Sequence, residues 1–282
     1  MENTKVDSDD ELGKHKPKPT KPPKPTKPPK PTPGPTPGPT PAPTPSGPVP
    51  PSPAAPIIPA GATVVYNIEM NKFKDISELS ALGCKYQYSY PENSGFTATS
   101  PNPKYFALTG TNGLAVNIYV GDKPFQSGSS TEPRSELRFM APITDDKDYV
   151  YSWDQYITPT PSFDYAWSQV FGSNGPAFIL RYRSGSFQLL QDQSNKQIIK
   201  FTDTSITPQS DTGVWVNWRL EFKCSKSGYE RLYRNGVLMC EATAVNNSIG
   251  TDAYLKNGIY SQQMVPSNNV TIYKDNIICY YT

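Results

Sequence analysis

The sequence predicts an all-β protein, an antiparallel β-sandwich of jelly-roll type, preceded by a disordered proline-rich linker. Two observations lead to this prediction. Residues 1–60 hold 21 of the 32 prolines and few large apolar residues, so they cannot bury enough surface to offset the entropy of ordering. From Gly61 onward, short segments alternate apolar and polar residues and are separated by Gly, Asn, Asp, Ser and Pro, which is typical of sandwiches and barrels.

The composition divides the chain into three parts. Residues 1–15 form an acidic head that we expect to be disordered, and residues 16–60 form a linker rich in Pro, Thr and Lys. Proline at every second or third position favours an extended polyproline II spacer. Residues 61–282 form one domain of about 220 residues, a size that β-sandwiches reach as single domains.

The domain is predicted to consist almost entirely of strands. Helical periodicity is confined to residues 75–83, where one or two turns are expected. The dipeptides Asn-Gly at 235–236 and Ser-Gly at 184–185 predict hairpin turns, because both allow positive φ. The alternating segments lie, in order, at 62–70, 105–110, 114–121, 135–142, 149–157, 167–172, 178–192, 214–224, 229–240, 253–262 and 270–281.

Charge and hydropathy exclude several classes of protein. The formal charge of +2 combines +3 from residues 1–60 (8 Lys against 5 Asp and Glu) with −1 from the remainder (19 against 20). The domain is therefore not a basic nucleic-acid binder, and anion recognition has to come from a local cluster. No apolar run is long enough for a transmembrane helix, and the N-terminus lacks the apolar core of a secretory signal peptide.

A charged row stands out in the segment RSELRF. Arg134, Glu136 and Arg138 would share one face of a strand, while Leu137 and Phe139 would point into the core. An exposed strand rarely carries such a row.

Two later segments divide in the same way. In WSQVFG, Gln169 and Phe171 share a face. In YLKNGIYSQ, one face carries Tyr254, Lys256, Gly258, Tyr260 and Gln262, and the other carries Leu255 and Ile259. Three strands thus present polar and cationic groups on one side and apolar groups on the other.

The ordered set RSELR, SQVFG and YLKNGIYSQ resembles the three hallmark segments of the jelly-roll alginate lyases, polysaccharide lyase family seven. The pattern of that family is approximately R-[ST]-E-L-R, Q-[IV]-H-G and Y-[FL]-K-x-G-x-Y-x-Q, in the same order and at similar spacing. Related glucuronan and heparin lyases share the sandwich and a strand of K-x-G-I-Y type. The resemblance spans most of residues 61–282 and implies a concanavalin-like fold and a lyase that cleaves a uronate polysaccharide by β-elimination, without cofactor or metal.

The resemblance also implies roles for single residues. Arg134 and Gln169 correspond to the residues that neutralise the uronate carboxylate, which is needed because the C5 proton is not acidic beside a fully charged carboxylate. Tyr260 corresponds to the catalytic Tyr, which acts as base and acid. A free Tyr has a pKa of about 10, so nearby cations would be needed to favour its phenolate. The candidates for substrate binding are Glu136, Arg138, Lys256, Gln262, Phe171 and Asn174.

The chain departs from the pattern at one position, because Phe171 stands where the family has a His and the only His of the chain is His15. Three interpretations stay open. Tyr260 works with Arg134 and Gln169, helped by Asn174 or another Asn; the substrate is a different polyuronate such as a glucuronan; or the domain has lost catalysis and only binds. The alternative to a lyase is therefore a carbohydrate-binding or adhesion domain, of laminin-G-like or lectin-like type, displayed on a cell or particle surface.

The remaining expectations concern partners and single side chains. We expect an acidic polysaccharide as partner, no nucleic acid, no membrane insertion, a monomer, and an extracellular or surface-displayed location. Arg181 and Arg183 are interpreted as an ordinary solvated face, with an extension of the positive groove as the alternative, and Trp167 as a core residue or a stacking platform for a sugar. Cys224 and Cys240 flank a predicted hairpin, so a disulfide between them and four free thiols are both open.

Overall fold

The computed structural model describes residues 48–89, 98–123, 132–158, 164–193, 196–262, 266 and 268–282. All of them belong to one compact unit, Pro41–Thr282. The predicted acidic head, residues 1–15, and the predicted linker as far as residue 47 lie outside the described residues.

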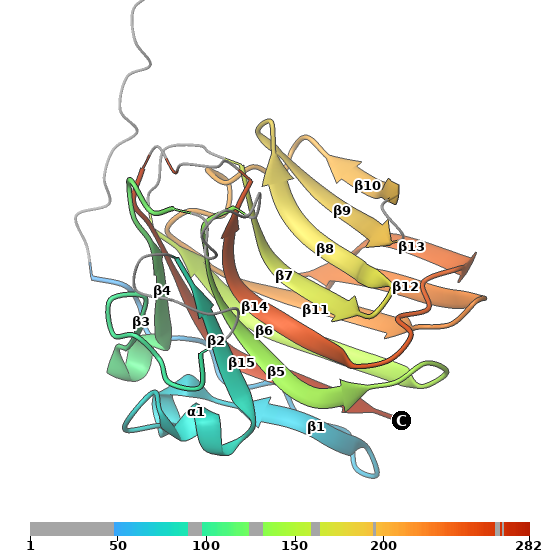
Figure 1. Ribbon diagram of the computed structural model, residues 1–282, viewed down its shortest axis with the longest axis horizontal. Coiled ribbons are helices and arrows are strands. Elements are labelled where there is room, and N and C mark those ends of the chain that lie inside the picture. Colours follow the sequence, from blue (N-terminus) through green and yellow to red (C-terminus); the bar gives the residue numbers. More distant parts are fainter. Residues whose placement is uncertain are drawn as a thin grey trace, which may run out of the picture. The chain divides into compact units, whose positions relative to one another are not determined.

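Two antiparallel sheets form a sandwich, which confirms the predicted fold class. Figure 1 shows them as two layers. The first sheet has the order β13-β12-β11-β6-β15-β4-β3, with β1 paired to β15, and the second has the order β10-β9-β8-β7-β14-β5-β2. Sequentially distant strands are neighbours in both sheets, as expected for a jelly roll.

The strand bounds follow the predicted segments closely. The first sheet consists of β1 (Thr63–Ile68), β3 (Phe106–Leu108), β4 (Leu114–Ile118), β6 (Asp148–Ile157), β11 (Trp215–Lys223), β12 (Gly228–Arg234), β13 (Val237–Val245) and β15 (Val270–Tyr281). The second consists of β2 (Cys84–Tyr88), β5 (Arg134–Ile143), β7 (Tyr165–Gly172), β8 (Gly175–Arg183), β9 (Ser186–Gln193), β10 (Lys196–Asp203) and β14 (Ala253–Ser261). The helical elements are α1 (Glu78–Ala81), η1 (Met70–Lys72) and η2 (Gly110–Asn112).

Two strands were not predicted, β2 and β10. β10 is an edge strand whose residues are all exposed or half-exposed. A strand without a buried face has no need to alternate apolar and polar residues, so its sequence carries no period-two signal. The predicted hairpin turns are confirmed, with positive φ at Ser184, Gly185, Asn235 and Gly236.

The core lies between the two sheets and fixes which residues of the second sheet face outward. Leu137 and Phe139 of β5 are fully buried, as predicted, and so are Leu255 and Ile259 of β14. They pack in one apolar cluster with the first sheet, including Trp153. The alternate residues of β5 and β14 must therefore lie on the opposite, outer side of the second sheet.

The end of the predicted linker lies against the first sheet. Ser52 bonds to the Asp275 carboxylate, and the Asn276 amide donates to the Pro53 carbonyl at 2.8 Å. The Trp215 indole donates to the Pro50 carbonyl at 2.9 Å. Residues 50–53 are thus hydrogen-bonded to the sandwich.

All four cysteines fall within the described residues and are free thiols. Among the helices of the described part, none is long and apolar enough to cross a membrane.

Candidate functional site

The charged row of β5 lies on the outer side of the second sheet and is nearly buried. Arg134 is 7% exposed, Glu136 1% and Arg138 9%. β5 pairs with β14 so that Tyr260 is opposite Arg134, Gly258 opposite Glu136 and Lys256 opposite Arg138. Arg134, Glu136 and Arg138 are therefore not a solvent-exposed row of ion pairs, because the side chains of the neighbouring strands cover them.

Glu136 is the centre of this polar cluster. Its carboxylate accepts hydrogen bonds from Arg134 Nη1 at 3.3 Å and from Lys256 Nζ at 3.2 Å. Gln169 Nε2, from β7, donates to the other carboxylate oxygen at 3.4 Å. A buried carboxylate is stable only when it is paired and hydrogen-bonded, and these donors meet that need. Three predicted strands thus converge on one residue.

We call Arg134, Glu136, Arg138, Gln169, Lys256 and Tyr260 the polar cluster. Its cations outnumber its carboxylate, so it favours an anionic ligand. Burial lowers the pKa of Lys256 to about 8, although Glu136 opposes the shift. Lys256 is therefore cationic at neutral pH but loses its charge at moderately alkaline pH.

Gly258 allows β5 and β14 to approach closely within the cluster. A Cβ at Gly258 would clash with the backbone carbonyl oxygen of Ser135 and lie 2.6 Å from Glu136 Cα. A glycine here therefore brings the backbone that carries Glu136 next to the strand that carries Lys256.

Tyr260 lies beside Arg134 at one end of the cluster. Its ring centroid is 4.4 Å from Arg134 Cζ, and its hydroxyl donates to Glu132 Oε2 at 2.7 Å. Burial raises the pKa of Tyr260 well above its usual range; Arg134 opposes the rise, and the Glu132 carboxylate adds to it. The cations that a resting phenolate would need are present, yet burial outweighs them, and Tyr260 is a phenol at neutral pH.

An aromatic pair lies at the other end of the cluster. Phe171 of β7 stacks on Tyr254 of β14, with ring centroids 5.4 Å apart. The Arg138 guanidinium lies 4.0 Å from the Tyr254 ring centroid, and Lys256 Nζ lies 5.4 Å from that of Phe171. Where the family pattern has a His, this chain therefore has a half-exposed ring beside Lys256.

A hollow of about 390 Å³ lies where β5 ends and β14 begins. The aromatic pair lies at this end of the two strands. Met140 and Pro142 of β5 line it together with Thr251 and Asp252, which precede β14. Since Arg138 and Met140 are alternate residues of one strand, the hollow adjoins the polar cluster.

The other predicted residues fall into two groups. Gln262 Oε1 accepts a hydrogen bond from Arg181 Nη1 at 3.0 Å, and Arg181 interacts electrostatically with Tyr260 of the polar cluster. Asn174 lies in the turn after β7, is exposed, and its amide donates to the Ser248 carbonyl rather than to the cluster.

The structure decides the interpretations of Arg181 and Trp167. The solvated face is wrong for Arg181, which is only 2% exposed and bonds to Gln188 and Gln197 of β9 and β10, whereas Arg183 is exposed. Trp167 is a core residue, buried against Tyr182 and Trp218, and is therefore not a platform for a sugar. A bulge between Ala166 and Ser168 shifts the alternation of β7 and turns Trp167 into the core.

No pattern in the sequence indicated Glu132 or Ser89, and Tyr254 was placed on the shared face without a role of its own. The Ser89 hydroxyl accepts from the Arg134 backbone N–H and donates to its carbonyl, both at 3.2 Å. This exchange extends the β2–β5 pairing by one residue and holds the start of β5. Ser89 is a common loop residue with no period-two signal, so only the fold could reveal its role.

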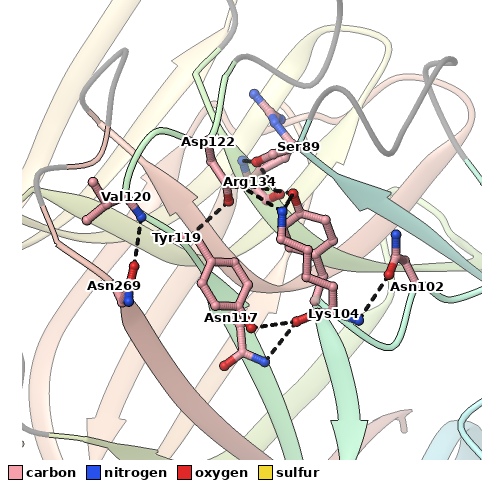
Figure 2. A network of polar contacts seen from close by, with 10 residues as sticks. Ser89, Asn102, Lys104, Asn117, Tyr119, Val120, Asp122, Arg134 and Asn269 are labelled. Atoms are coloured by element: carbon pink, nitrogen blue, oxygen red, sulfur yellow. Dashed lines mark hydrogen bonds and ion pairs between the residues drawn. The ribbon is translucent and has the colours of Figure 1, made fainter.

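Figure 2 shows Ser89 and Arg134 in one close view with the contacts of Lys104, Tyr119 and Asp122. The Tyr119 backbone N–H donates to Asp122 at 2.9 Å, and the Tyr119 hydroxyl donates to the Lys104 carbonyl at 2.8 Å. These contacts tie the segments around β3 and β4 together near the first residue of the site.

In the described residues, no group of three or more His, Cys, Asp or Glu side chains is arranged to hold a metal ion. The polar cluster itself consists of three cations, one amide, one carboxylate and one tyrosine.

Comparison with known proteins gives one family and one fold. The family model described as polysaccharide lyase matches residues 87–278. No curated protein matches the chain in sequence.

Three similar solved structures are lyases. The endo-β-1,4-glucuronan lyase from the fungus Trichoderma reesei has 13% identity and a TM-score of 0.51, covering 70% of this chain and 94% of its own. The alginate lyase from Corynebacterium sp. has 15% identity and a TM-score of 0.52, with coverages of 71% and 94%. An alginate lyase from Pseudomonas aeruginosa has 17% identity and a TM-score of 0.51, with coverages of 74% and 100%. At these identities the likeness shows the shared fold.

Proposed function

Since this chain belongs to the polysaccharide lyase family, we propose that it cleaves an acidic, uronate-containing polysaccharide such as alginate or glucuronan by β-elimination. The observation that carries the proposal is the polar cluster, in which Arg134, Lys256 and Gln169 converge on Glu136 next to Tyr260. A polyuronate has the complementary charge, and its cleavage needs the neutralising groups that this cluster holds.

The chemistry assigns a task to each part. The carboxylate of the uronate must be neutralised before C5 can lose its proton, and the charge that develops must be stabilised in a site of low dielectric. A guanidinium has five N–H donors in a fork and an amide has two, so Arg134 and Gln169 can bind a uronate carboxylate while Glu136 holds them in place. Arg138, Lys256 and the Phe171–Tyr254 pair would bind neighbouring sugars.

The absence of the motif His supports a second candidate, a carbohydrate-binding domain without catalysis. Phe171 cannot exchange a proton, and its half-exposed ring is suited to stacking on a sugar. A surface-displayed binding module would use the same cations and rings but would release no product.

One experiment separates the two candidates. The purified chain is incubated with alginate, polymannuronate, polyguluronate, glucuronan and hyaluronan, and the ultraviolet absorbance of the unsaturated uronate product is followed. A lyase produces a rise with at least one polymer, and Tyr260→Phe abolishes it while binding stays measurable by calorimetry. Binding without a rise, at high protein concentration and across pH, leaves the binding domain as the function.

We also propose an extracellular or surface-displayed location, with the part of the Pro-rich linker from residue 16 to residue 47 acting as a spacer between an attachment point and the domain. The support is compositional, because such sequences form semi-rigid extended spacers. Fractionation of cells producing the full chain tests this: recovery of the chain in the cytosol alone contradicts the proposal.

A further inference from the structure

The hydroxyl of Tyr260 has a carboxylate partner, Glu132, that no pattern indicated. The two residues are 128 positions apart in sequence, and the hydroxyl donates to Glu132 Oε2 at 2.7 Å. Glu132 lies two residues before Arg134, whose Nε donates to the Glu132 backbone carbonyl at 3.4 Å. A carboxylate therefore lies at the same end of the polar cluster as the proposed catalytic tyrosine.

We propose that Glu132 is the catalytic base that removes the C5 proton of the uronate, and that Tyr260 is the acid that protonates the leaving oxygen. This inference rests on the proposed function. It assigns to a second carboxylate the proton-accepting task that a His would otherwise take.

The state of Tyr260 supports this division of roles. Burial holds its pKa well above the usual range, so it enters the reaction with its proton and is an acid rather than a base. Its ring packs on an apolar floor formed by Ala166 of β7, Ile179 of β8 and Leu190 of β9. This floor keeps one side of the ring from water, and the hydroxyl is held by Glu132.

Glu136 is not suited to act as the base. It is 1% exposed, and its two oxygens accept from Arg134, Lys256 and Gln169. Taking a proton there would break a buried ion pair. Glu132 is half-exposed, so a sugar can reach it without such a loss.

The charged groups facing this end come from several strands. Arg134 of β5 lies beside the Tyr260 ring, and Arg181 of β8 interacts electrostatically with Tyr260. Both are cations, and they would stabilise the negative charge that moves from the base to the enolate during the reaction.

The proposed step balances within the site. The Glu132 carboxylate takes the proton from C5, and the electron pair of that bond moves into the enolate whose charge Arg134 and Gln169 offset. The pair then forms the C4–C5 double bond as the C4–O4 bond breaks, and O4 takes the proton of the Tyr260 hydroxyl. Glu132 finally returns its proton to the Tyr260 phenolate through their hydrogen bond, which restores the starting state.

The test uses Glu132→Gln, Glu132→Ala and the control Glu241→Gln, whose carboxylate forms an exposed ion pair with Arg231 on the first sheet. Removal of a general base typically costs about 10²- to 10⁴-fold in rate, so we expect kcat of Glu132→Gln to fall in that range with KM nearly unchanged. Added formate should restore part of the activity of Glu132→Ala, which it would not do if the Glu132 carboxylate were merely structural.

A second measurement needs no activity. The ionisation of Tyr260 is followed as the difference in tyrosinate absorbance between each protein and its Tyr260→Phe counterpart. Because the Glu132 charge disfavours the phenolate, Glu132→Gln should lower the pKa of Tyr260 relative to the parent chain.

The outcomes are distinguishable. An active parent chain with Glu132→Gln within about threefold of it overturns the base assignment alone. Loss of activity in a folded Glu132→Ala without formate rescue, or an unshifted Tyr260 titration in Glu132→Gln, also overturns it. A parent chain that forms no product from any polymer overturns the proposed function, and the base assignment with it.

Discussion

Lys256 of β14 donates to Glu136 of β5 at 3.2 Å, and both side chains are almost completely buried. This contact joins two strands whose residues are 120 positions apart in sequence, and it lies at the centre of the polar cluster. Its consequences for stability and for ligand binding can be measured separately.

Removing the carboxylate should destabilise the fold strongly. Glu136→Gln leaves Lys256 and Arg134 as buried cations without their counter-charge, and breaking a buried pair in this way costs about 3–5 kcal/mol in the free energy of unfolding. Denaturant titration measures the loss. The exposed Arg231–Glu241 pair is the control, since Glu241→Gln should cost less than about 1 kcal/mol. Equal losses in the two variants would show that Glu136 is not the centre of the cluster.

Ligand binding should weaken as the pH rises through about 8, the pKa of Lys256. The sign follows from the charge: Lys256 is cationic below this pH and neutral above it, while an acidic oligosaccharide stays anionic throughout. Calorimetry with an alginate or glucuronan oligomer should show affinity falling several-fold between pH 7 and about 9. Lys256→Arg keeps its charge over this range and should bind without that decline. A decline of the same size in both proteins would assign it to another group.

A methyl group at position 258 should disturb the cluster through the backbone. Gly258→Ala directs a Cβ at the Ser135 carbonyl, and overpacking of this kind costs about 1–3 kcal/mol. Thermal unfolding should show a clear fall in Tm, together with weaker oligosaccharide binding. Thr243→Ala, at an exposed position of β13, serves as the control. An unchanged Tm would mean that β5 and β14 can separate without cost.

Restoring the motif His should create a new titration. The domain has no His, since the only one in the chain is His15. The pH profile of kcat/KM of the parent should therefore show no limb that reflects the titration of a histidine. Phe171→His places a group with an ordinary pKa of about 6.5 beside Lys256 and Tyr254, and a limb between pH 5 and 8 is expected. Phe171→Asn, which cannot titrate, should lack it. Identical profiles for the two variants would show that position 171 takes no part in proton transfer.

Truncation should reveal the role of the segment around Ser52. Removing residues 1–47 leaves the hydrogen bonds of Pro50, Ser52 and Pro53 intact, so Tm should be unchanged. Removing residues 1–60 deletes these bonds and exposes Asp275 and Asn276. Each lost bond is worth about 1 kcal/mol, so a lower Tm is expected. Equal Tm values for the two truncations would show that the segment does not support the sandwich.

The period of two identifies the buried side chains wherever the alternation of a strand is regular. On β5 and β14 the period of two separates core from site without error, from Leu137 and Leu255 on one side to Glu136 and Lys256 on the other. At Trp167 the period of two alone gives the wrong face, because a bulge adds a residue and turns the side chain into the core, which was one of its two interpretations. The solvated-face interpretation of Arg181 was wrong, since its burial by Gln188, Gln197 and Gln262 depends on which strands become neighbours.

The pattern of residues sets which side chains of a strand share a face, because successive side chains of a strand point to opposite sides. Which strands lie next to one another depends on pairing between distant segments, and no local pattern encodes it. The sequence therefore predicts that Arg134, Gln169 and Lys256 lie on the polar faces of their strands. It does not predict that all three contact Glu136. The bond between Tyr260 and Glu132 was decided by the tertiary structure alone, because it joins residues 128 positions apart that share no motif.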